Sequence, residues 1–347
     1  MTPLRDPRLQ RAHAWLCAQT DALLAQGWQL QPDSLRPASS DASFRRYFRL
    51  DAIHQGQPGG LILMDAPPEQ EDIRPFMAVA QLLARAGLHV PERFAHDLEQ
   101  GFLLCGDLGS TTYAHACADR QYDPRACDAL YQDAWRALVR LQQFSSPDHG
   151  GHPLPPYDHG RLMREMRLFD EWYLTRHRPT ELTASEREEL MGIYERIAQA
   201  CLTQPLVIVH RDFHSRNLMV TTQQNPGVLD FQDAVVGPIT YDLVSLLRDA
   251  YIAWPEEVQL DWTVRYWQDA RRAGLPVSQD FSDFWRDFEW MGLQRHLKVL
   301  GIFARLFYRD GKENYLHDIP VVWQYAHSVA RRYQGLGPLA RLLERSA

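Results

Sequence analysis

Hydrophobic and polar positions along the chain follow two patterns that change near residue 106. Residues 8–26 repeat leucine at helical spacing and are predicted to form an amphipathic helix ending at Gly27. The residues that follow contain short aromatic or aliphatic runs bounded by Gly/Pro turns, which is typical of strands. Apolar residues at helical spacing interrupt these runs only at 71–86. We therefore expect five strands and one helix after the N-terminal helix.

Beyond Gly106 the apolar spacing becomes mainly helical. Helices are predicted at 124–143, 160–177, 184–201, 242–252, 256–273, 282–308 and 320–344. Short β segments are expected at 206–209 and at 218–220, the latter paired through a turn with 228–230. The prediction is an α+β protein with two lobes: a small mixed β-sheet N-lobe at 1–105 and a mainly helical C-lobe at 106–347.

Composition narrows the classes of function. The 347 residues are 45% hydrophobic and 23% charged, which is ordinary for globular proteins. A net charge of -7 argues against nucleic acid as a partner, because phosphate contacts need a basic face. Five cysteines without metal-ligand spacing favour a reducing, cytoplasmic location, and no apolar run is long enough for a membrane span. Nothing in the sequence indicates an obligate protein partner.

One run of residues combines the groups that phosphoryl transfer from a nucleotide requires. A carboxylate must orient the attacking hydroxyl and accept its proton, and oxygen ligands must hold magnesium across the phosphates. His210-x-Asp212 followed by Asn217 puts a base and an amide oxygen on one short loop, and Asp230 ends the next strand. Taken singly, each of these residues is better explained as a turn, cap or core residue. Together they predict Asp212 as catalytic base and Asn217 with Asp230 as metal ligands.

These residues resemble those of the aminoglycoside phosphotransferase and choline kinase-like superfamily. The runs that carry this resemblance are 210–217, 229–233 and 238–243. Within the superfamily, the segments 40–48, 63–69 and 232–234 look like the bacterial N-acetylmuramate/N-acetylglucosamine anomeric kinases of cell-wall recycling. The resemblance spans nearly the whole chain. It implies a bilobal, protein kinase-like fold, with ATP and Mg2+ as cofactors and a small-molecule amino sugar as substrate.

Three functions are weighed on this basis. The leading one is an ATP-dependent kinase that phosphorylates the anomeric hydroxyl of the amino sugar to give the sugar 1-phosphate. A second is an aminoglycoside- or choline-type kinase, whose cationic substrate would need an acidic cleft. A third, of another class, is a nucleotide-binding pseudokinase that regulates a partner. The presence of Asp212, Asn217 and Asp230 argues against the third, because a non-catalytic module does not need a base and both metal ligands.

The resemblance also exposes two departures in the predicted nucleotide site. Superfamily members usually carry a basic residue on the third strand, paired with a glutamate on the following helix, and Met64 and Phe76 stand at these positions. Only two of the 37 Lys and Arg residues are lysine, so arginine is the available replacement for a phosphate contact. The candidates are Arg45, Arg46 and Arg49, which follow the loop of small residues.

The remaining nucleotide contacts are expected from backbone groups. Ser40 and Ser43 lie in a loop of small residues whose amides can approach phosphate, although the loop contains no glycine. Leu104 and Gly106 belong to a segment that resembles the kinase hinge, where backbone groups bind adenine; the same segment is equally explained as a connection between the lobes.

Two further assignments concern the C-lobe. Asp242 stands at the start of an apolar helix and is interpreted as a structural cap. Position alone leaves three arginines as candidates for binding the lactyl carboxylate of N-acetylmuramate: Arg211, Arg216 and Arg248. The sequence does not decide which of the two sugars is preferred.

Overall fold

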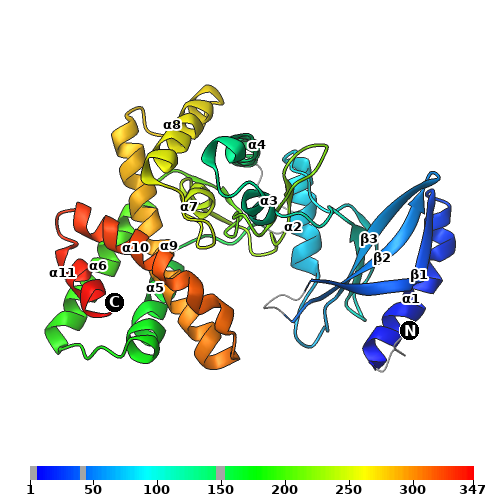
Figure 1. Cartoon of the computed structure of the whole chain (residues 1–347), viewed down its shortest axis with the longest axis horizontal. Helices are drawn as coiled ribbons and strands as arrows, with labels where there is room; N and C mark the ends of the chain where they lie inside the picture. The colour runs from blue at the N-terminus through cyan, green and yellow to red at the C-terminus, as the bar shows by residue number, and fades with distance from the viewer. Residues whose placement is uncertain (1–5, 40–43, 146–152) are drawn as a thin grey trace.

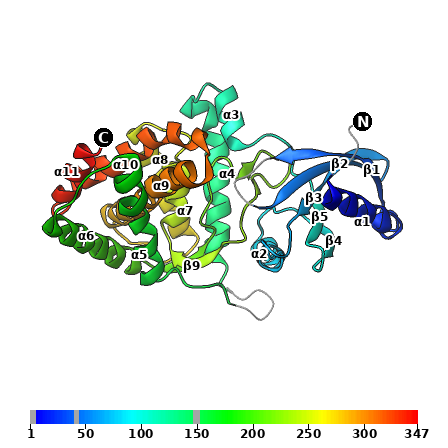
Figure 2. The same cartoon turned by 90° about the horizontal axis from the view of Figure 1, so that it is seen from below.

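The computed structural model describes residues 6–39, 44–145 and 153–347. A sheet with flanking helices forms one end of the molecule, and a larger helical region forms the other (Figure 1). The same separation is seen after a 90° rotation (Figure 2). The predicted α+β architecture with two lobes is confirmed.

The N-terminal sheet has five strands in the order β1-β2-β3-β5-β4. The strands are β1 (Trp28–Ser39), β2 (Arg46–His54), β3 (Gln57–Asp65), β4 (Arg93–Asp97) and β5 (Phe102–Gly106). All four pairings are antiparallel. The reason is connectivity: short turns link β2 to β3 and β4 to β5, and such turns join antiparallel strands.

Alternation along β2 gives the sheet two different faces. Phe48, Leu50 and Ala52 are buried and pack against α1 (Pro7–Leu24), as the amphipathic pattern of residues 8–26 predicts. The intervening residues Tyr47 and Arg49 point to the opposite face, toward the helical lobe. The side on which a β2 residue lies therefore decides whether it can meet a ligand between the lobes.

The helical lobe contains more breaks than the periodicity predicts. Its helical segments are α3 (Tyr113–Asp119), α4 (Pro124–Gln143), α5 (His159–Leu168), η1 (Phe169–His177), α6 (Ala184–Leu202), α7 (Tyr241–Leu247), α8 (Glu256–Arg272), α9 (Phe281–Asp310), η2 (Glu313–Asp318), α10 (Ile319–Arg332) and α11 (Gly337–Arg345). The predicted helix at 160–177 changes to a π-helical segment after Leu168. The predicted helix at 320–344 is interrupted near Gly335, whose φ of +89° has no place in a right-handed helix.

Two small antiparallel pairs carry the segments identified by the motif. β6 (Leu206–Val209) pairs with β9 (Val235–Pro238), and β7 (Leu218–Met219) pairs with β8 (Gly227–Val228). The first pair positions the loop that begins at His210, and the second places Asp230 just after a strand. The one helix between the N-terminal strands, α2 (Arg74–Arg85), packs its apolar face into the larger core, which also contains residues of the helical lobe.

Candidate active site

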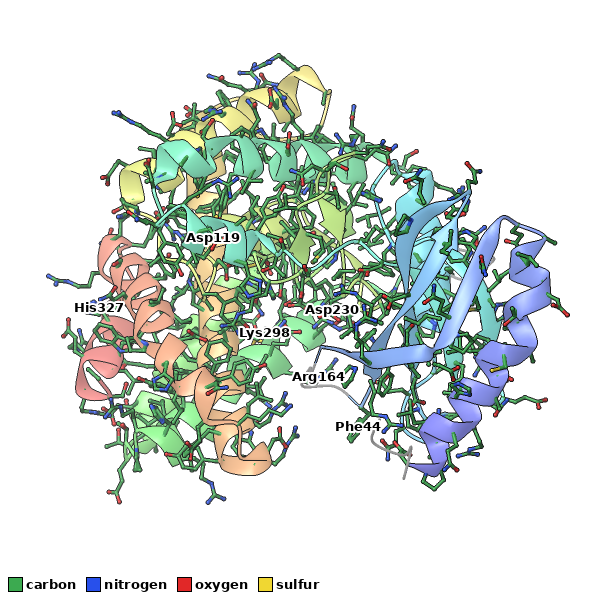
Figure 3. All side chains as sticks on the ribbon, turned by 45° about the vertical axis from the view of Figure 1, so that its right-hand side comes forward. Phe44, Asp119, Arg164, Asp230, Lys298 and His327 are labelled. Carbon is green, nitrogen blue, oxygen red and sulfur yellow. The ribbon has the colours of Figure 1, made fainter. Side chains whose placement is uncertain are left out.

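A cavity of about 860 Å³ lies between the two lobes. Its lining includes all three residues predicted to carry the chemistry, namely Asp212, Asn217 and Asp230. Figure 3 labels Lys298 on α9 and Asp230 nearer the N-terminal sheet, and both residues line the cavity. The spacing of the motif therefore corresponds to one shared site.

The loop that carries Asp212 is held by His210, which is fully buried. The Asp212 N–H donates to Nδ1 of His210 at 3.2 Å, and Nε2 of the same ring lies 3.0 Å from the Leu229 carbonyl oxygen. These contacts fit a neutral ring protonated at Nε2. Burial lowers the pKa of His210 to about 4, which keeps the ring neutral at physiological pH. His210 thus ties the Asp212 loop to the segment that leads into Asp230.

Asp242 supports the same loop from α7. Its carboxylate accepts the N–H of His210 at 2.6 Å and the N–H of Arg211 at 2.9 Å. Arg211 has a φ of +81°, a left-handed conformation that costs a non-glycine residue about 1–3 kcal/mol and must be held by its surroundings. Asp242 is therefore structural, as expected, but it braces the catalytic loop and does not cap its own helix. Burial raises the pKa of Asp242 to about 7 despite these two bonds.

Cations surround the Asp212 carboxylate, which is 36% exposed. Arg295 Nη2 lies 3.8 Å from Asp212 Oδ1, and both Arg295 and Lys298 line the cavity. Burial favours the neutral acid, but Lys298 and then Arg295 outweigh it and hold the pKa of Asp212 at about 2. The carboxylate is ionised throughout the physiological range and can accept a hydrogen bond from a hydroxyl group.

Asn217 and Asp230 lie beside each other, with Asn217 Nδ2 at 3.4 Å from Asp230 Oδ2. The same Nδ2 donates to the Asp212 carbonyl oxygen at 3.0 Å, and Gln232 Nε2 donates to Asp230 Oδ1 at 2.8 Å. No cluster of three or more His, Cys, Asp or Glu side chains able to hold a metal occurs in residues 6–39, 44–145 and 153–347. One carboxylate and one amide oxygen nevertheless fit Mg2+ that also binds nucleotide phosphates, because such sites take few protein ligands.

The sequence reasoning missed a buried polar network behind Asp212. Lys298 Nζ donates to Tyr241 Oη at 3.0 Å and lies 3.5 Å from Glu165 Oε1. Glu165 also accepts from Arg211 Nη2 at 2.7 Å and from the Tyr157 hydroxyl. One signal was available: Lys298 is one of only two lysines in the chain. Its partners come from distant parts of the chain and leave no common motif.

Asp249 was also missed. It lines the cavity, is only 2% exposed, and accepts the N–H groups of Ser215 and Tyr251, each at 3.0 Å. Asp249 thereby links the catalytic loop to the segment that follows α7.

The arginines predicted near the phosphates lie in three different environments. Arg46 points to the α1 face, where it pairs with Asp65 at 2.5 Å and with Asp6, and it is not among the cavity residues. Arg45 is largely buried and pairs with Glu71 at 3.1 Å. Arg49 does line the cavity, where its Nη2 donates to Asp107 Oδ1 at 2.9 Å.

The other predicted nucleotide contacts are distributed as follows. Gly106 lines the cavity, and its N–H donates to the Glu92 carbonyl at 2.8 Å. The Leu104 side chain is buried on the α1 face of the sheet, and its backbone pairs with the neighbouring strand β3. Ser40 and Ser43 lie outside the described residues.

The two residues that depart from the superfamily pattern, Met64 and Phe76, are apolar and lie in the protein interior. Met64 is fully buried and Phe76 is 4% exposed, and both belong to the larger hydrophobic core. The Phe76 ring lies 4.6 Å, centroid to centroid, from the ring of Phe231, which directly follows Asp230. Such aromatic pairs add about 0.5–1.5 kcal/mol beyond the burial of their area. In this chain an aromatic contact joins α2 to the segment that carries Asp230.

Comparison with known proteins agrees with this geometry. The phosphotransferase enzyme family matches residues 34–279. The chain is 46% identical over 340 residues to the N-acetylmuramate/N-acetylglucosamine kinase of Pseudomonas aeruginosa, covering 97% of this chain and 96% of the relative. It is 47% identical to the enzyme of that name from Neisseria meningitidis, with 88% of each chain covered.

Solved structures show the same fold at low sequence identity. The choline kinase LicA from Streptococcus pneumoniae superposes with a TM-score of 0.61 at 12% identity, covering 92% of this chain and 99% of the other. The ADP-bound aminoglycoside phosphotransferase APH(2'')-Ib gives a TM-score of 0.53 at 16% identity, covering 90% and 98%. The chain belongs to the phosphotransferase enzyme family and has its protein kinase-like fold. It is a phosphotransferase.

Proposed function

We propose that the chain is an ATP-dependent kinase that phosphorylates the anomeric hydroxyl of N-acetylmuramate and N-acetylglucosamine, giving the sugar 1-phosphate. The observation that carries the proposal is the convergence of Asp212, Asn217 and Asp230 on one cavity. The substrate class rests on relatives of that name that are 46% and 47% identical to this chain. We also propose a place in cell-wall recycling and a cytoplasmic location.

In this mechanism Asp212 orients the sugar hydroxyl and accepts its proton as the bond to phosphorus forms. Asn217 and Asp230 would hold Mg2+, which neutralises charge on the phosphates when bound. Lys298 and Arg295 lie beside Asp212 and supply positive charge from the helical lobe.

Nucleotide binding is assigned to the face of the N-lobe sheet that lines the cavity. We place the boundary between the lobes at 105/106, with residues 1–105 contributing the nucleotide sheet and residues 106–347 the catalytic loops. Gly106 and its neighbours hold adenine through the backbone, and the loop with Ser40 and Ser43 approaches the phosphates. Of the arginines, Arg49 is favoured for a nucleotide contact because it lines the cavity, whereas Arg46 does not.

The acidity of the acceptor favours the anomeric hydroxyl. A carboxylate with a pKa of about 2 is a weak base for an ordinary alcohol. The ring oxygen makes the anomeric hydroxyl the most acidic on the sugar, so its proton is the easiest for Asp212 to accept. Positioning and metal charge supply most of the rate in either case.

The alternative of a kinase for aminoglycosides or choline has less support. Near Asp212 the cavity is lined by the cations Arg216, Arg295 and Lys298 and also by the carboxylates of Asp230 and Asp249, so its charge does not decide between the substrates. The relatives named N-acetylmuramate/N-acetylglucosamine kinase are 46% and 47% identical to this chain, whereas the choline kinase and the aminoglycoside phosphotransferase are 12% and 16% identical. The pseudokinase alternative is disfavoured by the complete set of base and metal ligands.

A substrate screen tests the proposal. ADP formation from ATP in the presence of Mg2+ is measured with each of four acceptors in turn: N-acetylmuramate, N-acetylglucosamine, an aminoglycoside and choline. We expect turnover with the two acetylated sugars alone. The methyl glycoside of N-acetylglucosamine is the matched control and should be inert, because its anomeric oxygen is blocked. Turnover of the aminoglycoside or choline in place of the sugars would overturn the substrate assignment.

No helix within the described ranges is long and apolar enough to cross a membrane. We propose that the enzyme acts on its small-molecule substrate without nucleic acid, a membrane or an obligate protein partner.

A further inference from the structure

At the end of the cavity where we expect the sugar to bind, one of the lining cations, Arg216, differs from the others in its surroundings. This end is formed by the catalytic loop, α9, η2 and the segment after α7, and it lies away from the N-terminal sheet. Aromatic rings line it in sequence: Tyr251 lies 6.3 Å from Phe303, and Phe303 lies 5.2 Å from Tyr315, measured between centroids. Arg216 is placed over the first ring, with its guanidinium carbon 3.5 Å from the Tyr251 centroid.

The structure distinguishes between the three arginines that the sequence left as candidates for binding the lactyl carboxylate. Arg211 is committed to Glu165 at 2.7 Å and does not line the cavity. Arg248 is 4% exposed, pairs with Glu289 at 3.0 Å, and is likewise absent from the lining. Arg216 alone of the three lines the cavity, and 49% of its side chain is exposed.

The other cavity cations at this end are already engaged. Arg295 donates to the Arg211 carbonyl at 2.9 Å and to the Tyr241 hydroxyl at 3.1 Å, and it neighbours Asp212. Lys298 is held by Tyr241 and Glu165. The carboxylate that pairs with Arg216 is that of Asp318, whose Oδ2 lies 3.8 Å from Nη2 and so beyond hydrogen-bond distance.

We infer that Arg216 binds the lactyl carboxylate of N-acetylmuramate and thereby sets the preference between the two sugars. The inference rests on the proposed function. N-acetylmuramate differs from N-acetylglucosamine only by a lactyl ether that carries a carboxylate. A planar guanidinium binds a carboxylate through two parallel hydrogen bonds, and stacking on Tyr251 fixes its plane. Because Arg216 follows Asp212 by four residues, both ends of the sugar are positioned by one loop.

The test compares the ratio of kcat/KM for N-acetylmuramate to that for N-acetylglucosamine. In Arg216→Met, which keeps an unbranched apolar stem but loses the guanidinium and its charge, the ratio should fall by about 10- to 100-fold, the value of a charge-assisted hydrogen bond. The loss should appear mainly in KM, because the carboxylate contact exists in the ground state and the transition state alike. Arg216→Lys should restore part of the ratio.

Two further variants keep the test independent of any effect of Arg216 on folding. Asp318→Asn removes the competing carboxylate, so the ratio should rise by about two- to tenfold. Arg309→Met, a change of an arginine on α9 that does not line the cavity, should leave the ratio unaltered. A neutral probe, the lactyl amide of N-acetylmuramate, should be insensitive to the charge at position 216.

The possible failures are distinguishable. If the wild-type enzyme releases no ADP with either sugar, the proposed function is wrong and the inference falls with it. If the wild type uses both sugars and Arg216→Met lowers both kcat/KM values equally, the kinase assignment stands and the role of Arg216 in selecting the carboxylate is refuted. An unchanged ratio in both Arg216→Met and Asp318→Asn refutes it as well.

Discussion

The buried ring of His210 makes a quantitative prediction about stability and pH. Its pKa is about 4 in the folded protein, whereas an exposed imidazole in an unfolded chain has a pKa of 6.5. Below the unfolded value the unfolded state binds more protons than the folded state, so stability is lost as the pH falls from 6.5 toward about 4. From these two pKa values, lowering the pH from about 7.5 to about 5 costs about 2 kcal/mol through this one residue.

The perturbation that isolates this contribution is His210→Asn. The asparagine Oδ1 can still accept the Asp212 N–H but does not titrate. Urea unfolding is followed by tryptophan fluorescence, and eight of the ten tryptophans lie after residue 106, so the signal reports mainly on the helical lobe. The variant is expected to be less stable at both pH values. The decisive quantity is the loss of stability between them, which should shrink by about 2 kcal/mol.

A control removes a histidine of a different kind. His159, whose side chain is 49% exposed, is changed to asparagine, which accounts for any general effect of replacing histidine. Other histidines whose pKa is lowered, such as His214 and His296, are retained in every variant and cancel in the comparison. If the pH-dependent loss is the same in the wild type and in His210→Asn, His210 is not a neutral buried brace and the geometry of the catalytic loop is wrong.

Three predictions concern the site itself. Asp212→Asn should lower turnover by about 100- to 10,000-fold with little change in ATP affinity, measured by steady-state kinetics and nucleotide titration; near-normal turnover would remove it as the base. Asp230→Ala should raise the Mg2+ concentration needed for activity or abolish activity, and an unaltered magnesium titration would contradict its role as ligand. Arg49→Ala should raise the KM for ATP, because Arg49 lies on the face of β2 that lines the cavity. Arg46→Ala should chiefly lower the melting temperature, because it leaves the buried Asp65 with one partner fewer. The reverse pattern would refute the assignment of Arg49 to the nucleotide.

Local spacing made the catalytic loop predictable from sequence. Asp212 and Asn217 are fixed relative to each other by five residues of chain, and Asp230 follows the paired strands β7 and β8. Such a motif brings its members together whatever surrounds it. The two lobes were also predictable, because the change from strand to helical periodicity lies in the sequence itself.

Contacts between distant segments could not be predicted in this way. Glu165, Tyr241 and Lys298 meet behind Asp212 from three helices, and no spacing relates them. Arg46 and Arg49 illustrate a different limit: alternation puts them on opposite faces of β2, but it does not say which face adjoins the cavity. Asp242 looked like a helix cap because the sequence shows its own helix and not the loop packed against it.

The identity of the product tests the central claim most directly. The wild-type enzyme is incubated with ATP, Mg2+ and N-acetylglucosamine, and the product is examined by phosphorus NMR with proton coupling. Transfer to the anomeric oxygen predicts a phosphorus signal coupled to the single anomeric proton, as in a sugar 1-phosphate. A signal coupled to the two protons of a 6-phosphate would leave the kinase chemistry standing and contradict the anomeric assignment.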